Sequence, residues 1–261
     1  LDPAVASDIA SLSLLENLFD PLLRYDYAAR PVKLQANTTV AMPTVSANGL
    51  EYTFKLQPGI FFTPDPAFKG ERRELTAADY VYSIRRLYDP AIKSPWLILF
   101  EGKIEGDAAL KRAYGDATAL PGLQATDRYT LRIRLTAPDP NFLFYLATPA
   151  SSALAREVVA AYPGQAGNHP VGTGPFRIAE WKRSDRLVLL DLPGARVVLQ
   201  NEKHLLVETP EAARFTPGDI LLACPVHICP TCALHKEAYV VESGRVTGRW
   251  AVAARDRWLE A

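Results

Sequence analysis

The sequence is poor in methionine, cysteine and histidine, and it has no excess of charge of either sign. Its 261 residues include one Met, three Cys and four His, with 29 basic and 29 acidic side chains. Three cysteines are too few to cross-link a chain of this length by disulfide bonds, so the sequence does not predict a disulfide-bonded scaffold. Balanced charge argues against nucleic-acid binding and against a membrane-surface role, because both usually leave a basic stripe.

Long apolar runs are also absent. No run reaches the roughly 18 residues that a membrane-spanning helix requires, so we expect no membrane span. The sequence opens on Leu1 without an initiator methionine or an apolar leader, and we therefore expect it to begin in mid-protein or after processing. With 48% apolar and 22% charged residues, the composition is that of a globular protein of one or two domains.

Apolar residues at helical spacing predict two helices in the first third of the chain. The first spans residues 8–23, and Asp8 or Ser11 can cap its start. The second helix begins after Thr76, which has the capping-box spacing to Asp79, and an Asp-Pro pair ends it.

Alternation of apolar and polar residues predicts strands, and these cover residues 51–56, 129–135, 176–181 and 186–190. The basic face of the second strand is expected to be solvated. A glycine-rich turn at 172–175 precedes the third strand. Pro175 removes an amide donor there and no phosphate-loop motif is present, so the turn does not predict phosphate binding.

Three stretches carry a family resemblance, and they occur in this order: YTFKLQPGIFF, ELTAADYVYSIRRLYDP and VGTGPFRIAEWKRSDRLVLL. With the opening LDPAVASDIASLSLLENLFDPLLRYD, they resemble the extracytoplasmic solute-binding proteins of ABC importers, in the family 5 that binds oligopeptides, dipeptides and nickel. The resemblance covers residues 1–190. It implies an α+β fold, in which a partial lobe of a class II periplasmic-binding-protein-like fold is followed by a small, mainly β module.

This resemblance implies a function in transport. It implies binding of a peptide or similar small solute, interaction with the membrane subunits of an ABC importer and a periplasmic location. In such proteins two lobes close on the solute like a hinged clamp. Because the resemblance stops near residue 190, we expect solute binding to be impaired. The sequence does not identify the solute-contacting residues.

Residues 193–261 resemble a different family, the carboxy-terminal domain of D-threonine aldolase and D-serine dehydratase-like enzymes. The motifs that carry this resemblance are NEKH at 201–204, PGD at 217–219 and HICPT at 227–231. It implies, as the alternative function, a fragment of a lyase that depends on pyridoxal phosphate and a metal, with a cytoplasmic location. Because the barrel that binds pyridoxal phosphate has no counterpart here, we expect neither cofactor binding nor lyase activity.

The chain is therefore interpreted as a fusion of two partial domains, residues 1–190 and residues 193–261. The strand-like segments on either side of the junction suggest that the two pieces join through a hairpin around Pro193 and Gly194.

All three cysteines lie in the stretch CPVHICPTC, residues 224–232. His227 and Cys229 are two positions apart, so on an extended segment an imidazole nitrogen and a thiolate can reach one ion, and zinc suits that pair. The enzyme resemblance implies that both are ligands of zinc or another divalent metal.

Other interpretations of the cysteine cluster stay open. A structural zinc site would add Cys232 together with Cys224 or His235. A redox-active CxxC, a disulfide within the cluster and simple burial of small thiols are the further alternatives.

Zinc content tests the metal prediction. After chelator washing and zinc reloading, the full chain is expected to retain about one zinc ion, because the ligand pair and its neighbours hold the metal. The His227→Ala, Cys229→Ala double variant is expected to lose it in elemental analysis, whereas a Cys232→Ala variant keeps it. Equal zinc content in the wild type and the double variant would contradict the assignment.

Overall fold

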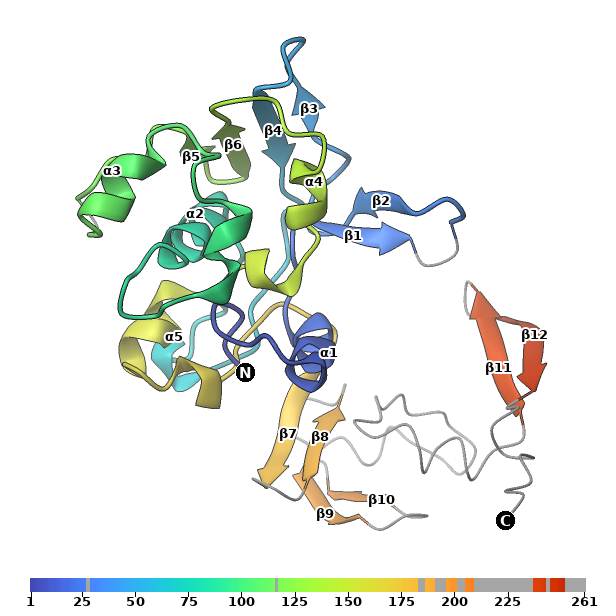
Figure 1. Ribbon diagram of the computed structural model, residues 1–261. Helices are drawn as coiled ribbons and strands as arrows, with labels where there is room; N and C mark the ends of the chain where they lie inside the picture. Colours follow the sequence, from blue (N-terminus) through green and yellow to red (C-terminus); the bar gives the residue numbers. More distant parts are fainter. Residues whose placement is uncertain are drawn as a thin grey trace, which may run out of the picture. The chain divides into compact units, whose positions relative to one another are not determined.

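The computed structural model describes residues 1–26, 29–115, 117–182, 186–190, 196–200, 205–208, 237–242 and 245–251. The chain divides into two compact units, Leu1–Arg177 and Ile178–Ala261. The first unit contains all the described helices, and β1 to β6 lie in it (Figure 1). The α+β fold class expected from the sequence is confirmed.

The helices of the first unit are short. The α-helices are α1 (Ile9–Leu18), α2 (Ala77–Arg86), α3 (Asp107–Arg112), α4 (Phe142–Tyr145) and α5 (Arg156–Ala161). The 3-10 helices are η1 (Pro66–Phe68), η2 (Pro95–Leu99), η3 (Pro149–Ser151) and η4 (Ala166–Asn168). The strands are β1 (Leu23–Asp26), β2 (Lys33–Ala36), β3 (Thr44–Val45), β4 (Glu51–Lys55), β5 (Leu123–Asp127) and β6 (Thr130–Arg134).

Helix α1 begins as predicted and ends earlier than predicted. The Asp8 carboxylate caps it by accepting a hydrogen bond from the Ser11 amide at 2.9 Å. The helix stops at Leu18, and Phe19 is extended. The proline at position 21 disfavours the helical conformation at Asp20, so the helix cannot readily extend to residue 23 as predicted.

The predicted capping box of α2 is present. The Asp79 carboxylate accepts hydrogen bonds from the Thr76 amide and the Thr76 hydroxyl, each at 2.8 Å. Tyr80 and Ile84 follow at helical spacing and are fully buried. Burial strongly raises the pKa of the Tyr80 hydroxyl, which therefore stays protonated and acts as a hydrogen-bonding group.

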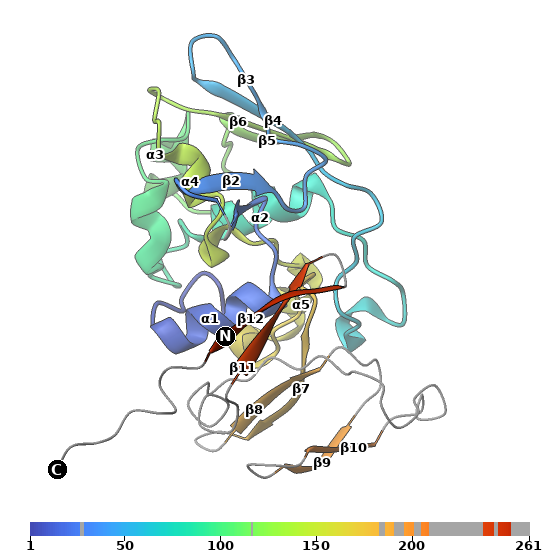
Figure 2. The ribbon, with the colours of Figure 1, turned by 90° about the vertical axis from the view of Figure 1, so that its right-hand side faces the viewer.

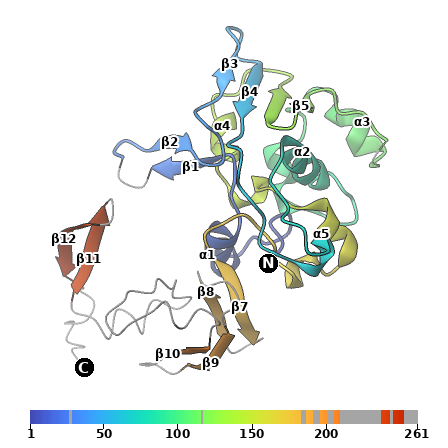
Figure 3. The same ribbon diagram turned by 180° about the vertical axis from the view of Figure 1, so that it is seen from behind.

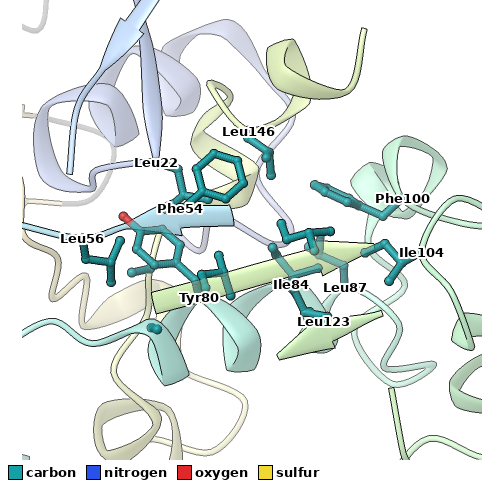
Figure 4. Close-up of a cluster of buried hydrophobic side chains, with 14 of the residues drawn as sticks. Leu22, Phe54, Leu56, Tyr80, Ile84, Leu87, Phe100, Ile104, Leu123 and Leu146 are labelled. Carbon is teal, nitrogen blue, oxygen red and sulfur yellow. The ribbon is translucent and has the colours of Figure 1, made fainter. Parts of the chain in front are cut away.

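Four antiparallel strands form the main sheet in the order β3-β4-β6-β5. The predicted strands over 51–56 and 129–135 are β4 and β6, and they pair directly, with Phe54 opposite Leu131 and Tyr52 opposite Ile133. These apolar side chains are buried, and α2 packs against β5 and β6 (Figure 3). Figure 4 shows the resulting core, in which Phe54 and Leu56 lie with Tyr80 and Ile84 of α2.

Two hairpins extend from this core. Strands β3 and β4 form the hairpin at the top of Figure 2. Strands β1 and β2 pair only with each other among the described residues, from Leu23 opposite Ala36 to Asp26 opposite Lys33.

The described part of the second unit consists of strands. They are β7 (Arg177–Lys182), which begins at the last residue of the first unit, β8 (Arg186–Leu190), β9 (Arg196–Gln200), β10 (Leu205–Glu208), β11 (Glu237–Glu242) and β12 (Arg245–Ala251). They pair as three separate two-stranded sheets, β7-β8, β9-β10 and β11-β12. Because β8 and β9 lie in different sheets, the predicted hairpin around Pro193 and Gly194 is wrong. The predicted domain boundary between 190 and 193 stays a prediction.

The glycine turn before β7 packs directly on the end of α1. The Gly174 amide donates to the Leu18 carbonyl at 3.0 Å, and the Phe176 amide donates to the Asn17 carbonyl at 3.1 Å. A Cβ atom on Gly172 would lie 2.0 Å from the Leu18 carbonyl oxygen, so only glycine fits there. The turn thus donates hydrogen bonds to carbonyl groups that have no partner within the helix.

Replacing Gly172 is expected to destabilise the protein. Gly172→Ala places a methyl group against the Leu18 carbonyl and should lower the free energy of unfolding by about 1–3 kcal/mol, the usual cost of overpacking. Gly115→Ala is the matched control, because a Cβ there meets only the Thr118 hydroxyl at 3.8 Å. Urea denaturation of both variants provides the measurement, and equal midpoints for Gly172→Ala and wild type would refute the packing role.

Candidate functional site

A cavity of about 480 Å³ lies in the first unit, beside the segment that leads into α1. Its walls come from this amino-terminal segment, the end of α2 and the segment 164–168, and they include Asp2, Val5, Ala6, Arg86 and Ile92. Both apolar side chains and polar backbone groups therefore border it, as in many sites for small solutes.

The two charged side chains of this cavity neutralise each other. The Arg86 guanidinium donates to both carboxylate oxygens of Asp2, at 2.7 and 2.6 Å. Burial works against the charged guanidinium, but its hydrogen bonds to Asp2 and the charge of that carboxylate keep the pKa of Arg86 above its ordinary value. This pair fixes the amino-terminal segment against α2, so the cavity wall is rigid on that side.

Exposed aliphatic side chains lie on the amino-terminal segment, on α1 and on η2, and of these Val5 lines the cavity. Ile9 is 85% exposed and Val5 is 47% exposed, both on the amino-terminal segment and the start of α1, and Ile98 of η2 is 75% exposed. The Trp96 indole N–H donates to the Ala6 carbonyl at 2.8 Å and so ties η2 to the same segment. We call Val5, Ile9 and Ile98 the aliphatic surface. Exposed apolar groups gathered on linked segments are typical of binding surfaces.

A second, smaller hollow of about 200 Å³ lies at the carboxy-terminal end of α1. Its lining includes Glu16, Phe19, Asp20, Arg24 and Tyr25. We call it the α1-end hollow.

Hydrogen bonds fix the Asp20 wall of the α1-end hollow. One carboxylate oxygen accepts from the Asn37 amide group at 3.2 Å and the other accepts from the Thr173 hydroxyl at 2.9 Å. The Asp20 carbonyl accepts from the Tyr80 hydroxyl at 3.0 Å. Side chains from three separate parts of the chain thus hold one residue.

The predicted metal ligands His227 and Cys229 lie outside the described residues, as does the rest of the cysteine cluster. The zinc site therefore stays a prediction. Within the described ranges, no group of three or more His, Cys, Asp or Glu side chains is placed to hold a metal ion. No helix in the same ranges has the length and apolar character needed to cross a membrane.

Sequence reasoning did not find the exposed residues of the aliphatic surface or of the α1-end hollow. Ile9 follows the apolar spacing of the predicted first helix, but it is the first residue of α1 and is exposed. Ile98 lies in a 3-10 helix of 5 residues, which is too short for a repeating apolar pattern to predict its exposure. Glu16 and Arg24 carry no motif, and only the tertiary structure brings them to one hollow.

Comparison with protein families gives two matches on this chain. The model of the bacterial extracellular solute-binding proteins, family 5, matches residues 24–193. The model of the putative serine dehydratase domain matches residues 151–241 and so overlaps the first match. Both resemblances expected from the sequence are confirmed. The match to the serine dehydratase domain begins at residue 151, earlier than the predicted residue 193.

Curated relatives support the first match. The chain is 33% identical over 184 residues to the di/tripeptide-binding protein 4 of Pseudomonas aeruginosa, covering 66% of this chain and 31% of that protein. It is 29% identical over 185 residues to the glutathione-binding protein GsiB of Pectobacterium atrosepticum, covering 71% of this chain and 30% of that protein. The chain thus spans about a third of the length of these relatives.

Solved structures agree with the sequence relatives. The peptide-binding pheromone receptor PrgZ aligns with a TM-score of 0.62 at 26% identity, over 73% of this chain and 36% of PrgZ. The substrate-binding domain of an oligopeptide ABC transporter from Bacillus anthracis aligns with a TM-score of 0.63 at 25% identity, over 72% of this chain and 35% of that one.

Proposed function

The chain belongs to family 5 of the bacterial extracellular solute-binding proteins, and from this membership we propose that it binds a peptide-type solute for an ABC importer. The family match over residues 24–193 is the observation that carries the proposal. The names of the relatives support the solute class, because they bind dipeptides, tripeptides or glutathione.

We place the solute at the aliphatic surface and the adjoining cavity of about 480 Å³. Apolar peptide side chains would cover Ile9 and Ile98, which water surrounds in the free protein. The backbone around the cavity would offer hydrogen-bonding groups to the peptide main chain. The Asp2–Arg86 pair stays closed and stabilises the wall instead of meeting the solute.

The location and the strength of binding form part of the same proposal. A family of extracellular solute-binding proteins supports a periplasmic place of action beside importer membrane subunits. We further propose that this chain by itself binds peptides more weakly than a two-lobed clamp would, because a solute held on one side only keeps part of its surface in water.

Calorimetry with a short apolar peptide tests the proposed surface. The tripeptide Ala-Leu-Ala is expected to bind the wild-type chain saturably, and Ile9→Asp or Ile98→Asp should weaken binding about tenfold, because burial of one aliphatic side chain stabilises a complex by about 1.5 kcal/mol or more. Ile9→Asp should leave the fold intact, since an acidic residue in the first turn favours a helix.

The matched control is Val40→Asp, a change of the same type at a valine that is 63% exposed and lies outside the aliphatic surface. It should bind the tripeptide like the wild type. Equal weakening in all three variants, or no binding by the wild type, would refute the placement of the solute.

The alternative function is that of a fragment of a D-threonine aldolase or D-serine dehydratase-like lyase. The match of the putative serine dehydratase domain over residues 151–241 favours it. This region contains the predicted ligands His227 and Cys229. As the alternative, we therefore propose a domain that binds a metal ion and has no lyase activity.

Cofactor loading separates the two functions. After incubation with pyridoxal phosphate and removal of the excess, the full chain is expected to show no Schiff-base absorption, because the cofactor-binding barrel of such enzymes has no counterpart in this sequence. Borohydride reduction followed by mass spectrometry would reveal a trapped lysine adduct. One stoichiometric adduct at a single lysine would favour the enzyme fragment and count against the solute-binding proposal.

A further inference from the structure

The α1-end hollow is lined by charged residues of both signs. Glu16 and Arg24 both line it, and both residues are exposed. Among the described residues, neither group makes an ion pair or a side-chain hydrogen bond with another residue. The Asp2–Arg86 pair beside the larger cavity is different, because its two charges satisfy each other.

The frame of the hollow is fixed before any ligand arrives. Phe19 and Ala147 are buried and form an apolar floor. The Asp20 carboxylate beside them is held by Asn37 and Thr173. Preorganised walls reduce the entropy that binding costs.

The residues around Glu16 reduce the hydration of its carboxylate. Desolvation raises the pKa of the Glu16 carboxyl above its ordinary value, even though the side chain remains accessible. A cationic group placed next to this carboxylate would replace the lost water. Asp20, on the same wall, adds a second negative charge that favours a cation.

Tyr25, the residue after Arg24 in β1, supplies an aromatic contact in the hollow. The Tyr25 ring lines the hollow and stacks on the Phe144 ring, with centroids 6.2 Å apart and planes at 29°. Both rings keep about a third of their surface exposed. Tyr25 therefore offers a partly exposed aromatic ring to the side chain of a ligand in the hollow.

We propose that the α1-end hollow binds a small zwitterion of the free amino-acid type, with its ammonium at Glu16, its carboxylate at Arg24 and its side chain against Tyr25. The volume of about 200 Å³ suits a ligand of this size and is below the range of about 300–1,000 Å³ that drug-sized ligands occupy. This site is separate from the aliphatic surface, and its existence does not depend on peptide binding there.

Three related ligands test both charges in the full chain. Leucine carries both charges, leucinamide lacks the carboxylate and N-acetylleucine lacks the ammonium. In calorimetric or ligand-observed NMR titrations, leucine is expected to bind about tenfold more tightly than either derivative, which is the effect of one charge-assisted hydrogen bond.

Single substitutions assign each charge to its residue. Arg24→Gln should weaken leucine binding about tenfold and leave leucinamide binding unchanged. Glu16→Gln should weaken leucine binding and leave N-acetylleucine binding unchanged. Each unchanged ligand shows that the variant is folded and that the hollow persists.

The controls make the same changes of charge elsewhere. Glu71→Gln and Arg112→Gln alter exposed residues that do not line the hollow, and both should bind leucine like the wild type. Absence of saturable leucine binding, equal affinity for the three ligands, or equal effects of the hollow and control variants would overturn the proposal. Ala-Leu-Ala binding that survives Arg24→Gln would show that the aliphatic surface works independently.

Discussion

The first unit depends on Asp20, which lies just beyond the end of α1. The proline that follows disfavours the helical conformation at Asp20, and the carbonyl and carboxylate of this residue bind other elements. Tyr80 of α2, Asn37 after β2 and Thr173 of the glycine turn each donate a hydrogen bond to this residue. One helix end thus connects the core helix, the β1–β2 hairpin and the segment that leads to β7. The α1-end hollow exists because these three connections fix its walls.

The elements predicted best from the sequence are those in which local chemistry and burial agree. Helix α2 has its capping box at Thr76 and a buried stripe, and β4 and β6 alternate because one face of each packs on the core. The elements predicted poorly lack such agreement. Helix α1 has apolar residues beyond Leu18, but these continue into the core as extended chain, which periodicity cannot distinguish from a longer helix.

Family motifs and binding residues were predictable to different degrees. The stretch VGTGPF is recognisable because its glycines contact the backbone at the end of α1 too closely for a side chain. Such a contact restricts the residue type to glycine, and the restriction can be read in the sequence. Ile98, Glu16 and Arg24 have no comparable constraint. Glu16 and Arg24 border one hollow and Ile98 is exposed, and these properties arise only when distant segments meet.

The overlap between the two family matches, residues 151–193, can be assigned by its physical contacts. The Leu154 amide donates to the buried Ser83 hydroxyl of α2 at 2.7 Å, and Glu157 of α5 pairs with Arg73 at 2.8 Å. The Thr173 hydroxyl reaches Asp20 in the same unit. Up to Arg177, the overlapping segment therefore packs within the first unit, against the residues that the solute-binding family matches alone.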